Sequence, residues 1–96
     1  MTQVIITPRV QGDIEDAIGL LELPSDTWTR VRHSLRVLET FPLGGRALGG
    51  RWADIRFVLG PWRWMVLLYR YEEGVDCIYV VAVHDARSSS SALSGE

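Results

Sequence analysis

The sequence predicts a small α+β domain in which a helical hairpin packs on a largely antiparallel sheet of four strands. Two observations lead to this fold class. Segments rich in β-branched and aromatic residues stand at the start and in the second half of the chain. Between them lie two segments whose apolar residues recur every three or four positions, the spacing of a helix with one buried face. The predicted order of elements is therefore β-α-α-β-β-β.

The first half of the chain supplies one strand and two helices. Residues 3–7 form a short β-prone run, and Pro8 suits the first turn of a helix, where its missing N–H leaves no bond unmade. Apolar residues then follow at helical spacing, in one stripe before Pro24 and another after it: Val10, Ile14, Ala17, Ile18 and Leu21, then Trp28, Val31, Leu35 and Leu38. The short link at Pro24 predicts an αα-hairpin.

The middle of the chain carries a small duplication. Residues 43–47 (LGGRA) are followed directly by residues 48–52 (LGGRW). Backbone N–H groups beside glycines can bind anions, which would make this segment a phosphate cradle. The spacing matches neither the P-loop nor the dinucleotide-binding fingerprint, however, and no helix is predicted after it. We therefore expect an irregular, exposed connection.

The second half of the chain supplies three strands. Residues 54–59 form one strand, which is closed by a Gly-Pro turn signal. Residues 63–71 and 77–83 are apolar runs separated by a charged, glycine-containing break, and this pattern predicts a β-hairpin. Apolar residues at both alternate phases place its strands at the centre of the sheet. Residues 1–87 are therefore expected to make one domain, and residues 88–96, rich in serine, a flexible polar tail.

Composition and charge argue against several classes of protein. All ten basic residues are arginines, yet the net charge is −2, unlike a general nucleic-acid binder whose affinity depends on phosphate neutralisation. One cysteine and two histidines, widely separated, predict no metal site, and no cofactor is expected. A lone cysteine forms no internal disulfide, and neither a signal peptide nor an apolar run of membrane-spanning length is found. We therefore expect a cytoplasmic protein without membrane partners.

The candidate functional residues lie where the central hairpin ends. His84 and Arg87 close the last strand, and Arg63 opens the strand that is predicted to pair with it. Arg56, on the preceding strand, would extend this basic edge. Histidine is the usual proton carrier at neutral pH, and arginines hold phosphodiesters or acidic partners. The alternative interpretation is a strand end whose polar groups are simply solvated.

The order of these features resembles the RelE/ParE superfamily of bacterial type II toxins, over roughly residues 4–87. A short strand leads into Pro8-Arg9 and an acidic helix start. The second helix runs into residues 38–46 (LETFPLGGR), which are similar to the "L..P..G" segment of that superfamily. The last strand ends in residues 83–87 (VHDAR), which are similar to its terminal "V-H-x-x-R" segment.

This resemblance implies a growth-inhibiting toxin, of the kind linked to plasmid stabilisation, that a cognate antitoxin neutralises. One branch of the superfamily poisons DNA gyrase, and another is a ribosome-dependent endoribonuclease acting on mRNA. Carried over by position, Arg56, Arg63 and Arg87 would bind phosphate or target. In a ribonuclease, His84, Arg63 and Arg87 would be the catalytic residues. The chain has no lysine and no tyrosine after Arg87, which weakens stabilisation of a phosphorane and favours gyrase.

Two further possibilities stay open at this point. A domain of this fold can lose its toxicity and persist as a binding module, so the resemblance does not decide whether the chain is an enzyme. The protein is also expected either to join its antitoxin in a hetero-oligomer or to form a homodimer on its own.

Overall fold

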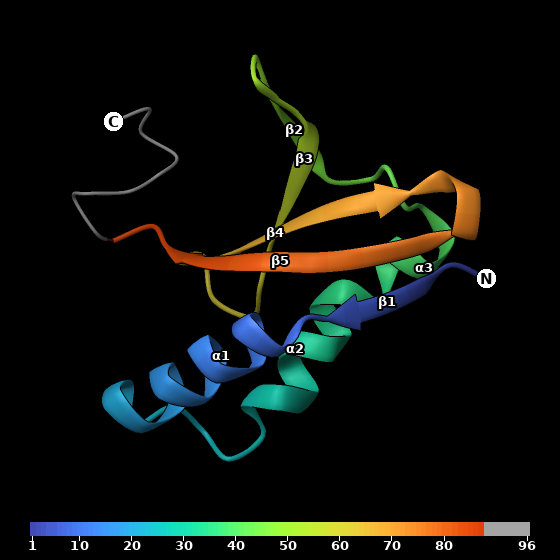
Figure 1. Ribbon diagram of the computed structural model, residues 1–96. Helices are drawn as coiled ribbons and strands as arrows, with labels where there is room; N and C mark the ends of the chain where they lie inside the picture. The colour runs from blue at the N-terminus through green and yellow to red at the C-terminus, as the bar shows by residue number, and fades with distance from the viewer. Residues whose placement is uncertain (88–96) are drawn as a thin grey trace.

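A computed structural model describes residues 1–87, which form a mixed sheet with helices on one face (Figure 1). The elements are, in chain order, β1 (Gln3–Ile6), α1 (Pro8–Leu21), α2 (Thr27–Leu35), α3 (Val37–Thr40), β2 (Arg46–Gly49), β3 (Trp52–Leu59), β4 (Met65–Glu72), a 3-10 turn (Glu73–Val75) and β5 (Cys77–Asp85). The sheet order is β1-β5-β4-β3-β2, with β1 parallel to β5 and the other pairs antiparallel. The α+β class and the central position of β4 and β5 are therefore confirmed, whereas the expected tail at 88–96 lies outside the described residues.

The sheet has five strands rather than the predicted four, because the duplicated glycine segment forms a hairpin and not an irregular connection. Arg46–Gly49 make up β2, which pairs with β3, and β3 begins at Trp52 rather than at Asp54. Gly49 and Gly50 have φ angles of 79° and 58°, which residues with a Cβ rarely adopt. The second glycine pair thus turns the chain, and Figure 1 shows the hairpin rising away from α1 and α2.

The second predicted helix is divided in two. The short α3 follows α2 after Arg36, whose N–H bonds to the carbonyl oxygen of His33 at the break. The predicted buried stripe persists across the break, because Val31, Leu35 and Leu38 are at most 3% exposed. Within residues 1–87, no helix is both long enough and apolar enough to cross a membrane.

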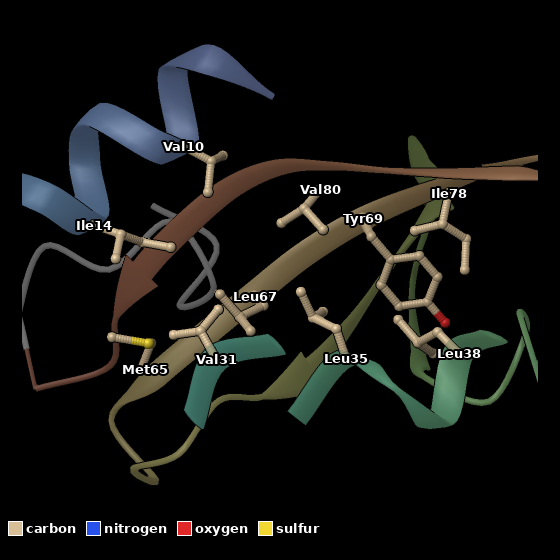
Figure 2. Close-up of a cluster of buried hydrophobic side chains, with 10 residues drawn as sticks. All are labelled: Val10, Ile14, Val31, Leu35, Leu38, Met65, Leu67, Tyr69, Ile78 and Val80. Carbon is tan, nitrogen blue, oxygen red and sulfur yellow. The ribbon is translucent and has the colours of Figure 1, made fainter. Parts of the chain in front are cut away.

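The core lies between the helices and the face of the sheet turned toward them (Figure 2). Its buried side chains come from the three helices and from the two central strands: Val10, Ile14, Val31, Leu35, Leu38, Met65, Leu67, Tyr69, Ile78 and Val80. Burial of each large aliphatic side chain stabilises the fold by about 1.5–3 kcal/mol. The apolar spacing of the helices and the apolar density of β4 and β5 therefore have the same cause, a shared core.

Tyr69 joins this core to the segment that leads into β2. Its side chain is fully buried, and its hydroxyl accepts a hydrogen bond from the N–H of Gly45 at 2.8 Å. Arg56, directly opposite Tyr69 on β3, donates from Nη1 to the carbonyl oxygens of Leu43 at 3.2 Å and Gly45 at 3.0 Å. A Cβ on Gly45 would stand 2.6 Å from the tyrosine ring, so only glycine fits there.

Replacing either partner of this contact should destabilise the protein. Tyr69→Phe should cost about 1–3 kcal/mol of unfolding free energy, because the buried N–H of Gly45 loses its acceptor. Gly45→Ala should cost more, because the methyl group also meets the carbonyl oxygen of Phe57 at 2.7 Å. Urea unfolding followed by circular dichroism measures both. Gly12→Ala, in open space on α1, is the control and should stabilise slightly. A Gly45→Ala protein as stable as the wild type would contradict the contact.

The unfolding free energy at alkaline pH gives a second test of the burial of Tyr69. Burial raises the pKa of Tyr69 above its ordinary value of 10.0. The folded chain therefore holds the phenolic proton more tightly than the unfolded chain, and this part of the stability is lost as the pH rises above about 10. Tyr69→Phe should lack this loss. The difference in unfolding free energy between wild type and variant should shrink at alkaline pH, and a constant difference would argue against the raised pKa.

Candidate functional site

One face of the sheet carries no helix among the described elements. Leu67 and Tyr69 of β4 point into the core, so Val66 and Leu68, which alternate with them, point to the opposite face. In Figure 1, α1 and α2 lie on one side of β4 and β5, and the β2–β3 hairpin rises on the other. We call the helix-free side of β3, β4 and β5 the open face.

Cross-strand neighbours define which residues form the open face, because directly opposite residues share a face. Across β3, β4 and β5 the open face consists of three rows: Leu59, Val66 and His84; Phe57, Leu68 and Ala82; and Ile55, Arg70 and Tyr79. The central row is entirely apolar. Leu59 is 47% exposed and Arg70 is exposed at the opposite end, whereas the central row is partly exposed and Val66 is only 3% exposed. The open face is therefore an apolar surface with a histidine in one end row and an arginine in the other.

A β-bulge brings His84 to the open face. Ile78 and Val80 point into the core, so strict alternation along β5 would send His84 there as well. The pairing with β4 shifts by one residue between Val80 and Ala82, and Val81 is the extra residue. His84 is consequently half-buried on the open face. A bulge of this kind follows from the pairing with β4, and the local sequence carries no signal for it.

Arg87 is held at the end of β5 by a carboxylate and an aromatic ring. Its Nε and Nη2 donate to the carboxylate of Asp85 at 3.0 and 2.9 Å, and its guanidinium lies 4.2 Å from the centroid of the Trp64 ring. Trp62 stacks on Trp64 with centroids 5.8 Å apart, and both rings pack against the core. Arg63, between these tryptophans in the chain, is exposed. The structure thus brings Arg63 and Arg87 to the same end of the sheet.

Arg56 does not belong to that group. It is opposite Tyr69, on the side of the sheet that faces the helices, and its Nη1 is bonded to backbone carbonyls. His84 is opposite Val66, three residues farther along β4 and on the other face. Three residues of a strand span about 10 Å. The continuous basic edge that the sequence suggested is therefore not assembled, because Arg56 is separated from the other candidates.

Comparisons of the chain with models of protein families, with curated proteins and with solved structures found no match. The resemblance to the RelE/ParE superfamily therefore stays a hypothesis founded on residues of this sequence. Within residues 1–87, no three histidine, cysteine or acidic side chains are grouped so that they could hold a metal ion.

The ion pair at the end of β5 should be visible in the titration of its carboxylate. Hydrogen bonds from the Arg87 side chain hold the pKa of Asp85 below its ordinary value of 3.8. This pair contributes stability above the ordinary pKa, and the contribution is lost as the pH falls through the lowered one. In Arg87→Ala the pKa of Asp85 should return toward 3.8, as measured by carboxyl NMR titration. Arg63→Ala is the control and should leave it low. An unchanged pKa in Arg87→Ala would rule out the ion pair in solution.

Proposed function

We propose that this chain is the cytoplasmic toxin of a type II toxin–antitoxin pair, and that it inhibits growth by binding DNA gyrase through its open face. The starting point is the resemblance of the sequence to the RelE/ParE superfamily. A helical hairpin on one side of the sheet and a side without helices opposite suit a protein that presents its sheet to a partner. The contacts that the candidate arginines make bear on the choice between target binding and RNA cleavage.

The observation that favours target binding over RNA cleavage is that two of these arginines are already held by contacts within the protein. Cleavage of a phosphodiester needs positive charge placed where the phosphorane develops. Arg56 is turned toward backbone carbonyls, and Arg87 is neutralised by Asp85 and stacked on Trp64. Within residues 1–87, Arg63 is the one predicted phosphate ligand without such a contact. A single exposed arginine is a weak site for the charge of a phosphorane.

The open face has the composition of a protein interface. Its central row of Phe57, Leu68 and Ala82 is apolar, and exposed Arg70 lies at the margin. Protein interfaces combine such an apolar centre with arginine and aromatic side chains. The three residues of this row are adjacent and partly exposed, and contiguous apolar surface that reaches solvent marks interaction sites. A cognate antitoxin that covers this face would block target binding, which accounts for neutralisation.

Inhibition of gyrase tests the proposal. An excess of the purified protein should slow supercoiling of relaxed plasmid, and expression in a bacterium should cause filamentation. Leu59→Lys, on the open face, should weaken inhibition by about tenfold, because the ammonium group would be desolvated in the contact. Leu20→Lys is the matched control, since Leu20 is 82% exposed on α1 and away from the sheet. Circular dichroism confirms that both variants fold.

Other results would redirect the proposal. Unchanged supercoiling in the presence of excess protein would exclude gyrase as the target. Discrete cuts in translated mRNA, mapped by primer extension and lost in Arg63→Ala, would support the ribosome-dependent ribonuclease instead. A chain that binds an antitoxin but affects neither gyrase nor mRNA would be a binding module of the same fold.

A further inference from the structure

A second surface lies at the free edge of β1. This strand ends the sheet order and pairs with β5. The N–H groups of Gln3 and Thr7 donate to the carbonyl oxygens of Asp76 and Val80, on the side of β1 that faces β5. Backbone groups point alternately to the two sides of a strand, so those of Val4 and Ile6 point away from β5. Among residues 1–87, the carbonyl of Ile6 accepts from Nε2 of Gln11 at 2.8 Å, whereas both backbone groups of Val4 and the N–H of Ile6 have no partner.

A groove of about 560 Å³ runs along this edge. One wall is β1, and the other is built by α2 and α3, which lie beside it in Figure 1. The lining residues that matter for binding are Val4, Ile6, Leu35, Arg32, Arg36 and Glu39. The groove therefore combines unpaired strand backbone with an apolar floor and charged side chains above it.

The charged wall of the groove has an excess of arginine. Arg32 and Arg36 are separated by one helical turn, and like charges at this spacing repel each other. In the part of the chain that is described, neither side chain is in an ion pair, and Arg32 lies 6.0 Å from the centroid of Trp28. Glu39 offsets only one of the two charges. An incoming carboxylate would relieve the repulsion.

We propose that this groove binds an extended acidic segment of another protein, which joins the sheet as an additional strand beside β1. Its backbone would pair with Val4 and Ile6, and side chains on one of its two faces would meet Arg32 and Arg36. Two neighbouring carboxylates, two residues apart on such a strand, are spaced by about 7 Å, which suits arginines one helical turn apart.

A second copy of this chain fits the groove poorly. β1 has the sequence QVII and carries no charge. Pairing of two β1 strands would therefore leave Arg32 and Arg36 of each groove without an acid to neutralise them. The proposal is independent of the gyrase-binding role, and its test uses neither gyrase nor cell growth.

The probe is a short, capped, fluorescein-labelled peptide that alternates glutamate with valine, and fluorescence anisotropy measures its binding. Saturable binding is expected, and a matched peptide with lysine in place of glutamate should not bind. The double variant Arg32→Glu with Arg36→Glu should weaken binding by about tenfold. The control Arg9→Glu with Arg51→Glu makes the same change of net charge at exposed positions outside the groove, and it should bind as the wild type does.

Amide hydrogen exchange by NMR tests the strand addition itself. In the free chain the amides of Val4 and Ile6 should exchange faster than those of Gln3 and Thr7, and the peptide should protect them selectively. Equal binding of the lysine peptide, no saturable binding, or unprotected Val4 and Ile6 in the complex would overturn the proposal. Protection that rises with protein concentration without peptide would overturn it in favour of a second copy.

Discussion

The hydrogen bond from the N–H of Gly45 to the buried hydroxyl of Tyr69 fixes where the β2–β3 hairpin begins. Tyr69 is immobilised by the core around it, and Gly45 is the last residue before β2. A buried N–H must find an acceptor, and here a side chain from the middle of β4 provides it. Arg56 adds bonds to two carbonyls of the same segment. The margin of the open face formed by β3 therefore depends on a polar contact made on the other side of the sheet.

Two of the arginines that looked functional have structural roles, and the chemistry of the guanidinium explains both. Its planar array of donors can bind two carbonyls at once, as Arg56 does, or a whole carboxylate, as Arg87 does with Asp85. Its flat face also packs on an indole ring. The two proposed binding surfaces would hold their partners through different interactions. The open face offers apolar area, whereas the edge of β1 offers unpaired backbone beside uncompensated charge.

Periodicity predicted the central strands and most of the buried stripes of the helices, which depend on the shared core, but Leu21 at the end of the first stripe is 43% exposed. Periodicity could not predict β2, because Arg46–Gly49 become a strand only by pairing with β3. Nor could it place Arg56 and His84 on opposite faces, since that depends on the register of three strands and on a bulge. The contact at the end of β5 has a local signal in the sequence. Asp85 ends β5, and aspartate side chains commonly accept from the backbone N–H two residues on, as Asp85 does from Arg87 at 2.9 Å, so a contact between these two residues was predictable.

The extra residue at Val81 divides β5 into two parts with opposite phase. Before it, even-numbered side chains such as Ile78 enter the core, and after it an odd-numbered one, Val83, packs there. Positions of β5 that tolerate polar substitution should therefore be odd-numbered before the bulge and even-numbered after it. Loss of Val81 would restore regular alternation along β5 and leave His84 on the open face, because the residues after the bulge already follow the register of β4. The extra residue therefore decides which sequence positions of β5 reach the open face, and the part of the strand beyond it stays aligned with β4.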